Sequence, residues 1–535
     1  MKRFFYFLTG LLLLTACDSE EGNGTGGEVL PPVEISKMKT ENNKVFVEVD
    51  GVPFPIYGAQ IRLDAFLNCD KMSMNEVEKY FEKGKALGVN CLEVGVTWNM
   101  IEPKEDAFDF SIVDKILEYA NRYGVRIELL WFSSNFIGDS FSYFVPAYIL
   151  QNLNNRLYRN DDGSFWNYYG YQYALILNDK WVLERETNAI TRLFNHIRGW
   201  DAGHGEKHPV ITAQIHNEPD GLVRWRMDQK QFAYRNGAPL TKEAAWKMTL
   251  DALDALGKAV KNSSYKVVTR TNLIRGNGTE PYPEAPNAKP SDVLALDGID
   301  FVSFDPYLSN IDDLAKEVSA YALLPGNYPL VAENKGTYPN TPGLMLVTSA
   351  LGGGYDIYDL ATSSFFIANT NAPDEIDHGV YTSGLEDKPH TEAVRTILKG
   401  LVMAAPDIAR TPAEDFIAFN VEENNPLQLA EQQIQSTGVT VRFSTNNGSI
   451  GFVLDRQNYL LLYVTGDAML QFGNGTFQEA VTGKYNEQGV FEQDGTASLD
   501  DSHSLHASGG VLYKINYTSA GKLQSTTKAY IGKTM

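Results

Sequence analysis

Cysteine is scarce in this chain, which has three cysteines in 535 residues: Cys17, Cys69 and Cys91. Because Cys17 ends an N-terminal targeting segment, two thiols remain for the rest of the chain. Two cysteines cannot build a disulfide framework or supply the ligands of a structural zinc site. Cys91 begins an apolar run, which favours a small buried residue over a disulfide partner for Cys69.

Basic residues are also in the minority. The chain has 46 Lys and Arg against 67 Asp and Glu, a formal net charge of -21 at pH 7. Such a surface repels phosphate backbones and anionic lipids. We therefore expect no nucleic-acid partner and no direct binding to an anionic membrane surface.

Motifs of several other enzyme classes are missing. No Gly-x-Ser-x-Gly nucleophile elbow occurs, and the glycines at 352–354 lack the Lys and Ser or Thr of a phosphate-binding loop. His204 and His208 lie four residues apart, but the glycines and the proline around them exclude the helix that a zinc site of this kind needs. We expect neither a metal ion nor a cofactor.

A short apolar run at residues 4–14 follows two basic residues. The run is too short to span a bilayer and fits a secretory signal. The Leu-Thr-Ala-Cys sequence ending at Cys17 resembles the lipobox of bacterial lipoproteins. The resemblance implies a lipoprotein signal at 1–17, a polar tether at 18–40, and an outer-membrane protein anchored through lipidated Cys17, facing the periplasm or the cell surface. An ordinary signal peptide with an unrelated cysteine is the alternative.

The composition predicts a folded chain with a sizeable core. Apolar residues make up 43% and aromatic residues 12%, which excludes a disordered chain. A chain of 535 residues is too long for one ordinary core. Two domains, or a large barrel with a second module, are therefore expected.

Short β-rich runs alternate with longer helical patterns over residues 41–408. This rhythm predicts an α/β fold in which eight parallel strands close into a (β/α)8 TIM barrel, the catalytic domain, preceded by an N-terminal hairpin. An open doubly wound sheet is the alternative, but its first turn would be glycine-rich, and Gly58-Ala59-Gln60 is not. The expected strands are residues 57–64, 90–98, 125–132, 210–218, 265–272, 299–307, 329–334 and 355–360.

The pattern changes in the last part of the chain, residues 409–535. Short strands are punctuated there by Asn-Gly, Thr-Gly and Asp-Gly turns, and helical patterns are scarce. These features predict a C-terminal antiparallel β-sandwich domain. Such a module either braces the barrel or binds carbohydrate.

The fourth expected strand ends abruptly in Asn217-Glu218-Pro219. Alternation places Gln214, His216 and Glu218 on one face of it. If that face lines a barrel, Glu218 stands at the C-terminal end, where barrel enzymes keep their catalytic residues. A strand end with an exposed glutamate is the structural alternative.

The seventh expected strand, residues 329–334, also ends an apolar run in a glutamate, Glu333. Glycoside hydrolysis with retention uses two carboxylates about 5–5.5 Å apart, one protonated and one ionised. Carboxylates from non-adjacent strands can meet at this distance across the C-terminal rim of one barrel. Glu218 and Glu333 are therefore candidates for such a pair.

Here the chain resembles the clan A retaining glycoside hydrolases, which carry Asn-Glu-Pro after the fourth strand and a Glu after the seventh. Trp-Asn-Met-Ile-Glu-Pro at 98–103 and Phe-Asp-Phe-Ser at 108–111 look like a region of the β-galactosidases of glycoside hydrolase families 35 and 42. So do Asp50-Gly51 before the first strand and Asp162-Gly163 after the third. The resemblance covers roughly residues 45–405.

The resemblance implies roles for three residues. Glu218 would be the acid/base, Glu333 the nucleophile, and Asn217 would hydrogen-bond the 2-hydroxyl of the sugar. The negative charge of Glu333 would raise the pKa of Glu218, so that Glu218 keeps its proton until the first step.

Glu333 must stay ionised near neutral pH, and hydrogen-bond donors around it would favour this. Arg62 and Tyr307 are the candidates. Arg62 has a structural alternative, an ion pair with Asp64 or Glu93 inside the barrel. The alternative for Tyr307 is a packed phenol.

Other residues are candidates for the walls of a sugar pocket. Gln60, Trp98 and Asp305 are further candidates for the pocket lining, although packing is the simpler interpretation of each. Aromatic rings such as Trp131 offer a surface for the C–H face of a pyranose. Further rings lie on or near the loops, where core packing is the alternative for any single one: Trp166, Tyr168, Tyr169, Tyr171 and Trp225.

The sequence therefore predicts a retaining glycoside hydrolase that cleaves a β-linked oligo- or polysaccharide, with exo-β-galactosidase activity as the leading specificity. It would contact the membrane only through its lipid anchor. A clan A endo-glucanase or mannanase is one alternative. A surface glycan-binding lipoprotein without turnover is another, and release of nitrophenol from aryl β-glycosides distinguishes these classes.

Overall fold

The computed structural model of the protein describes most of the chain. The described residues are 30–134, 144–153, 156–159, 162–164, 167–168, 172–173, 175–221, 223, 234–235, 238–274, 288–419, 432–436, 440–445, 449–456, 458–473, 477–500, 504–517 and 523–525.

Eight parallel strands close into one barrel in the order in which they follow along the chain. Each expected strand is present, so the predicted TIM barrel is confirmed and the open sheet is excluded. Both faces of most strands are buried, one against the helices and the other in the lumen. The strands are β5 (Tyr57–Ile61), β6 (Cys91–Thr97), β7 (Arg126–Phe132), β10 (Val210–Ile215), β14 (Val268–Ile274), β15 (Phe301–Asp305), β16 (Val331–Lys335) and β17 (Tyr355–Tyr358).

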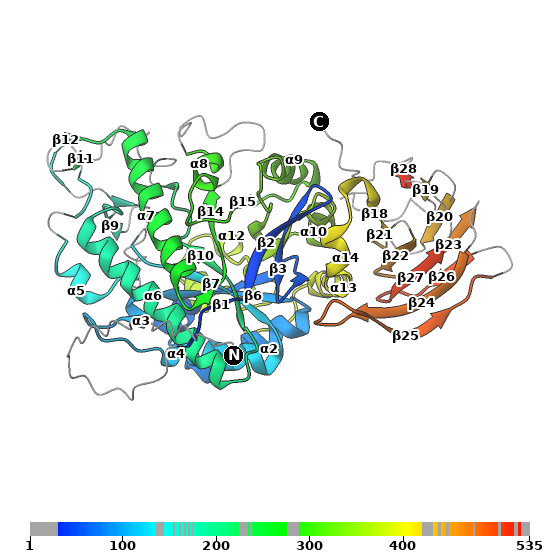
Figure 1. The fold of residues 1–535 in the computed structure, drawn as a ribbon, viewed down its shortest axis with the longest axis horizontal. Helices are drawn as coiled ribbons and strands as arrows, with labels where there is room; N and C mark the ends of the chain where they lie inside the picture. The colour runs from blue at the N-terminus through cyan, green and yellow to red at the C-terminus, as the bar shows by residue number, and fades with distance from the viewer. Residues whose placement is uncertain are drawn as a thin grey trace, which may run out of the picture. The chain divides into compact units, whose positions relative to one another are not determined.

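Helices cover the outside of the barrel, and α6 and α7 run side by side along it (Figure 1). Local sequence sets their ends. Ser73 and Glu76 form a capping box at the start of α2, and Gly88 ends this helix with φ +98°. The longer helices are α2 (Met74–Leu87), α4 (Ser111–Tyr123), α6 (Lys180–Gly203), α7 (Lys242–Asn262), α9 (Ile311–Ala322), α10 (Thr341–Ala350) and α13 (Thr391–Met403).

A small antiparallel sheet precedes the barrel. It contains the predicted hairpin, β3 (Lys44–Val49) and β4 (Val52–Pro53), and an added strand, β2 (Ser36–Glu41). The hydroxyl of Ser36 donates to the backbone carbonyl of Ile211 at 2.5 Å and accepts from the backbone N–H of Val268 at 2.9 Å. This sheet therefore contacts the N-terminal part of β10 and β14. Glu218 and Glu333 follow or lie in barrel strands at the other, C-terminal end.

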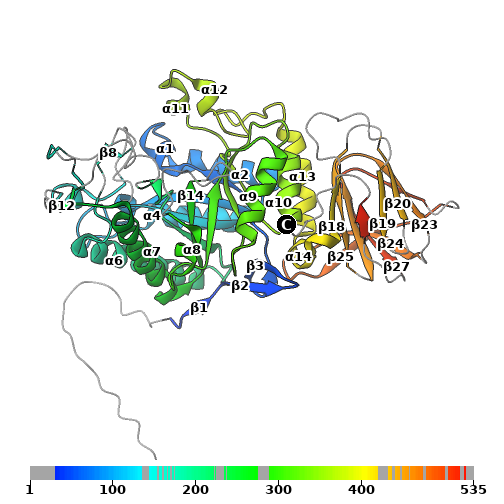
Figure 2. The ribbon, with the colours of Figure 1, turned by 90° about the horizontal axis from the view of Figure 1, so that it is seen from above.

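The C-terminal part contains two antiparallel sheets, seen as the orange and red strands in Figure 2. The predicted sandwich is confirmed, while the boundary at residue 409 stays a prediction. Side chains such as Val453, Leu462 and Ile515 form its core. One sheet has β18 (Phe416–Phe419), β21 (Gly451–Asp455), β22 (Tyr459–Val464), β27 (Leu512–Tyr517), β24 (Phe477–Tyr485) and β25 (Phe491–Ala497), and the other has β26 (Ser504–Ala507), β23 (Ala468–Gly473), β20 (Thr440–Thr445), β19 (Gln432–Ser436) and β28 (Leu523–Ser525).

Asp407 in α14 (Ala405–Arg410) joins the barrel helices to this sandwich. Its buried carboxylate accepts hydrogen bonds from the hydroxyls of Tyr459 at 2.9 Å and Tyr485 at 2.5 Å. Arg456 lies 3.2 Å from the same carboxylate. These contacts support a bracing role for the sandwich.

Replacing Asp407 by alanine is expected to destabilise the protein by about 3 kcal/mol, because it removes one partner of a buried ion pair and leaves Arg456 without it. Chemical denaturation followed by circular dichroism measures this change. Glu487→Ala, which removes an exposed acid from the same sandwich, is the matched control and should change the stability by less than about 0.5 kcal/mol. Equal losses of stability in the two variants would contradict the bracing role of the Asp407 contacts.

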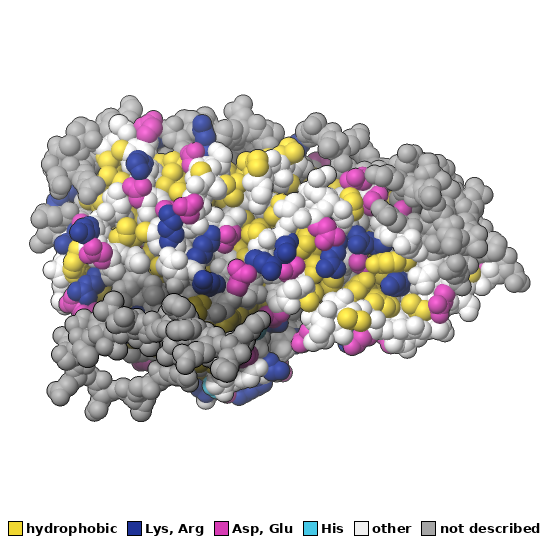
Figure 3. All heavy atoms as spheres, viewed as in Figure 1, with side chains coloured by type: hydrophobic (Ala, Val, Ile, Leu, Met, Phe, Trp, Pro, Cys, Tyr) yellow, Lys and Arg dark blue, Asp and Glu magenta, His cyan; other side chains and the backbone are white. Residues whose placement is uncertain are grey.

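The surface carries charges of both signs. On the face drawn in Figure 3, Lys and Arg side chains lie interspersed with Asp and Glu side chains. Among the residues that the structure describes, no helix has the length and apolar character needed to cross a bilayer.

Candidate active site

The C-terminal ends of the barrel strands bring the predicted site residues to one mouth. Glu333 lies in β16, the seventh barrel strand along the chain, and Gln60 lies in β5, the first. Glu218 follows β10 by three residues, and Tyr307 follows β15 by two. In TIM-barrel enzymes this end holds the active site.

The carboxylate of Glu333 is the best-defined part of this mouth. Its side chain is buried, the hydroxyl of Tyr307 donates to Oε2, and Nε2 of Gln60 donates to Oε1 at 3.4 Å. Burial raises the pKa of Glu333 above its usual value, while the Tyr307 hydrogen bond, the charge of Arg62 and the Gln60 hydrogen bond act in the opposite direction. The donors thus favour the ionised form that a nucleophile needs.

Arg62 acts on Glu333 through its charge. Its guanidinium forms a two-point ion pair with Asp64, with N–O distances of 2.9 and 2.7 Å, and donates to the hydroxyl of Tyr358 at 3.3 Å. The pairing with Asp64 that the sequence left as an alternative is therefore present. Arg62 follows the last residue of β5 and begins the turn into helix α1 (Leu63–Asn68), so it is not a strand residue.

The chain leaves the strand conformation directly after β10. His216 and Glu218 have positive φ values, +62° and +45°. The predicted alternation therefore stops at Ile215, and the expectation that His216 shares a face with Gln214 is wrong. Non-glycine residues adopt such conformations at a cost of about 1–3 kcal/mol, and the surrounding contacts have to offset it.

Those contacts come from Glu186 in α6, a buried acid that the sequence did not single out. Nε2 of His216 lies 3.1 Å from Oε1 of Glu186, and the hydroxyls of Ser133 and Ser134 donate to the same carboxylate. Burial alone would raise the pKa of Glu186, but the hydrogen bond and charge of His216 and the two hydroxyls hold it below its usual value. The cluster fixes the backbone just before Asn217.

Asn272 holds the same segment from the lumen side. Its Oδ1 accepts from the backbone N–H of Glu218 at 2.9 Å, and its Nδ2 donates to Oδ1 of Asn217 at 2.8 Å. Gln214 also donates to Asn217, at 3.3 Å. Asn217 and Glu218 are thus held between the lumen and helix α6.

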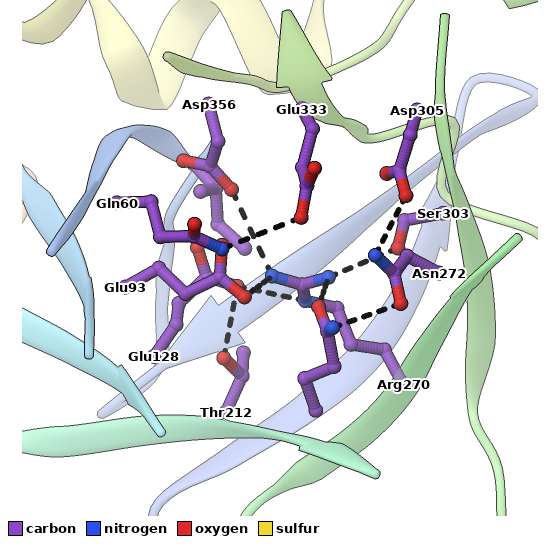
Figure 4. A network of polar contacts seen from close by, with 12 residues as sticks. Gln60, Glu93, Glu128, Thr212, Arg270, Asn272, Ser303, Asp305, Glu333 and Asp356 are labelled. Carbon is purple, nitrogen blue, oxygen red and sulfur yellow. Dashed lines mark hydrogen bonds and ion pairs between the residues drawn. The ribbon is translucent and has the colours of Figure 1, made fainter. Parts of the chain in front are cut away.

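A network of polar contacts lies beneath Glu333 and is centred on Arg270 (Figure 4). The guanidinium is fully buried, with N–O distances of 3.0 Å to Glu128, 3.1 Å to Glu93 and 3.8 Å to Asp356. Burial raises the pKa of Glu93 to about 8, although the charge of Arg270 opposes this. One arginine therefore lies among three acids in the lumen.

Sequence reasoning missed this network, although it had a usable signal. Arg270 is the charged residue in the uncharged run at 267–274, and alternation places Glu93 and Glu128 at lumen positions of their own strands. No group of three or more His, Cys, Asp or Glu side chains in the described part of the chain is arranged to hold a metal ion.

The two tryptophans predicted to bind substrate are both fully buried. Trp98 donates to Glu102 at 2.8 Å, so the Trp-x-x-x-Glu motif is an internal hydrogen bond. Trp131 alternates with Leu130 and Phe132 and points toward α6, where it donates to Glu186 at 3.0 Å. These positions do not fit the predicted pocket-lining role, because neither ring offers a free face to a sugar.

Several other predicted residues lie outside the described part of the chain. These are Cys17, Trp166, Tyr169, Tyr171 and Trp225, and for Tyr168 only the backbone is described. Asp305, in contrast, is buried at the end of β15, and its Oδ2 accepts from Asn272 at 2.8 Å.

Comparison with known families identifies part of the barrel. Residues 67–263 match the model of glycoside hydrolase family 42, described as Beta-galactosidase. The predicted resemblance to family 42 is confirmed. Glu218 lies inside this match. Residues 248–426, which include Glu333, and residues 3–65 match two models described as domains of unknown function, DUF4978 and DUF4969.

Several solved structures are similar to this chain, and one of them reaches a TM-score of 0.50. A β-galactosidase from the psychrophilic Marinomonas ef1 has a TM-score of 0.50 at 10% identity, and covers 67% of this chain and 62% of its own. An exo-β-1,4-mannosidase from an Opitutaceae bacterium has a TM-score of 0.47 at 12% identity, with 68% and 62% covered. The chain spans 62% of the length of each of these two proteins.

A family 39 glycoside hydrolase from the gut symbiont Bacteroides cellulosilyticus WH2 has a TM-score of 0.43 at 13% identity, and the match covers 89% of this chain and 84% of that one. No curated protein sequence matches the chain. The family 42 match covers residues 67–263, and the solved structure with a TM-score of 0.50 shows the fold alone.

Proposed function

We propose that the protein is a retaining β-glycosidase with exo-β-galactosidase activity, in which Glu333 is the nucleophile and Glu218 the acid/base. One observation carries the proposal. Glu333 lies buried at the C-terminal mouth of the barrel with two hydrogen-bond donors, Tyr307 and Gln60, on its carboxylate. Such donors favour the ionised form of a buried carboxylate.

The position of Glu218 three residues after β10 supports its role as the second carboxylate. Its charge and that of Glu333 both raise the pKa values of Asp305 and Tyr307. Both glutamates therefore act through charge on the same two residues near the C-terminal ends of the barrel strands. This arrangement supports a pair acting on opposite sides of one glycosidic bond.

In the first step an oxygen of Glu333 attacks the anomeric carbon while the glycosidic bond breaks. Glu218 gives its proton to the leaving oxygen, so the departing sugar leaves as a neutral alcohol. In the second step Glu218 removes a proton from water, and the resulting attack releases the sugar from Glu333 with its original configuration. Glu218 thereby regains its proton and Glu333 its charge.

The test is hydrolysis of a panel of p-nitrophenyl β-glycosides by the purified protein. We expect release of nitrophenol from the β-galactoside at least about tenfold faster than from the glucoside, mannoside and xyloside, because a site that hydrogen-bonds each hydroxyl of galactose rejects sugars in which a hydroxyl is inverted or missing. Proton NMR of the first product should show the β-anomer.

Other outcomes assign the other classes. Cleavage of long β-glucans or β-mannans without cleavage of aryl monosaccharides would assign an endo-acting enzyme. Binding of such glycans without hydrolysis would assign a surface glycan-binding protein. An α-anomer as the first product would contradict the double displacement.

The location forms part of the proposal. Cleavage before Cys17 and lipidation of its thiol would anchor the enzyme in the outer membrane, facing the periplasm or the cell surface. In this position the enzyme would act on oligo- or polysaccharide outside the cytoplasm.

A further inference from the structure

Asn272 makes four hydrogen bonds that fix the orientation of its amide. Its Oδ1 accepts from the backbone N–H of Glu218 and from Nε2 of Gln214, both at 2.9 Å. Its Nδ2 donates to Oδ1 of Asn217 and to Oδ2 of Asp305, both at 2.8 Å. Turning the amide by 180° would set its NH2 group against the N–H groups of Glu218 and Gln214 and break all four bonds.

Asp305 stands on the other side of this amide. Its side chain is 2% exposed, and Oδ1 has no hydrogen-bond partner among the described residues. Figure 4 shows Asp305 beside Glu333, with its other oxygen on Asn272. The mouth thus holds a third carboxyl group besides the two that the proposed reaction uses.

We propose that Asp305 and Asn272 are positioning residues, with Asp305 orienting the amide of Asn272 and Asn272 in turn holding Asn217 and Glu218 in place for proton transfer. This inference rests on the proposed function. It adds two residues to the site that act through others.

The electrostatics agree with this role. Burial, together with the charges of Glu333, Glu218 and Glu93, raises the pKa of Asp305 well above its usual value. A carboxylate at this position would repel both glutamates, whereas a neutral carboxyl accepts the Asn272 hydrogen bond without adding charge. An amide at position 305 would do the same.

The test uses the dependence of the rate on the leaving group. Departure of dinitrophenol needs little help from an acid, whereas departure of a sugar or an alkyl alcohol depends on proton donation. A misplaced Glu218 therefore slows the second kind of substrate and spares the first. A variant in which only the fraction of folded protein is smaller hydrolyses both kinds of substrate more slowly by the same factor.

We expect Asp305→Ala to lower kcat/KM about 100-fold for an alkyl β-galactoside and less than about threefold for the 2,4-dinitrophenyl β-galactoside. Asp305→Asn should keep both values within about threefold of the wild type. Asn272→Asp keeps the oxygen that accepts from the backbone N–H of Glu218 but removes the NH2 group that donates to Asn217 and Asp305. This variant should show the same selective loss as Asp305→Ala. Ser303→Ala, on the same strand but bonded to Arg270, is the matched control without selectivity.

Equal losses on both substrates for Asp305→Ala and Asn272→Asp would overturn the inference. The inference would also be overturned if Asp305→Asn were as selectively impaired as Asp305→Ala while its thermal unfolding midpoint showed that it is folded. Asp305 would then act through its own charge. If Asp305→Ala does not fold, the comparison of Asp305→Asn with Asn272→Asp decides. A wild-type protein that cleaves no glycoside would overturn the proposed function itself, and the inference with it.

Discussion

The Glu333→Ala variant is expected to lose turnover by about 10,000-fold or more, since the covalent intermediate forms on this carboxylate and its removal leaves only binding and acid assistance. Initial rates with the best aryl β-glycoside of the panel measure the loss. Added azide should enter the space that the side chain leaves and attack the anomeric carbon. The product is then the α-glycosyl azide.

Stability provides the control for this variant. Burial opposes the ionised form of Glu333, so the isosteric Glu333→Gln variant should unfold at the same temperature as the wild type or higher, while being equally inactive. An inactive variant that also unfolds at lower temperature would point to damage of the fold. A variant with near wild-type rates would contradict the assignment of the nucleophile.

The Glu218→Ala variant is expected to lose about 100- to 10,000-fold of its rate on β-galactosides with poor leaving groups, the usual contribution of a general acid. For the dinitrophenyl glycoside kcat/KM should change little, because its leaving group departs without a proton, whereas kcat should fall because the second step has lost its base. The glycosyl enzyme then accumulates, since no base activates water. Azide should release the sugar as the β-glycosyl azide.

The two azide products separate the two roles. Attack in place of the nucleophile inverts the configuration once, whereas attack on the glycosyl enzyme inverts it a second time. If the α-azide came from Glu218→Ala and the β-azide from Glu333→Ala, the roles would be exchanged. If neither variant gave an azide adduct, the pair would not act as proposed.

The fold was largely predictable because its signals are local. Apolar runs bounded by turns, with caps such as Ser73 and stops such as Gly88, specify strands and helices without knowledge of the partners they pack against. In the sandwich the β-rich runs form strands as predicted, but Asp494-Gly495, expected as a turn, lies inside β25. The barrel then follows from the alternation of the elements.

The surroundings of the candidate site were less predictable because they depend on contacts between distant segments. Glu186 contacts His216 only when α6 packs against the end of β10. The sequence around either residue does not predict this contact. Positive φ at His216 is unusual for a non-glycine residue, so counting alternate residues placed its side chain on the wrong face.

The predicted substrate-binding role of Trp131 does not fit the structure for a similar reason. Its type suits a sugar platform, but its place in β7 turns it toward the helix layer. Tyr307, in contrast, was predicted from its position at the end of the expected sixth strand, and its hydroxyl does donate to Glu333. The end of a strand was a better guide than the type of side chain.

The acids around Arg270 have a thermodynamic consequence for the whole protein. The pKa of Glu93 is about 8 in the folded chain and about 4.5 when unfolded, and burial raises the pKa of Asp356 as well. The native barrel thus holds protons at neutral pH that the denatured chain releases, so the contribution of these acids to the free energy of unfolding falls as the pH rises from about 4.5 to 8. In a calorimeter, the apparent heat of melting will change with the ionisation heat of the buffer that captures those protons.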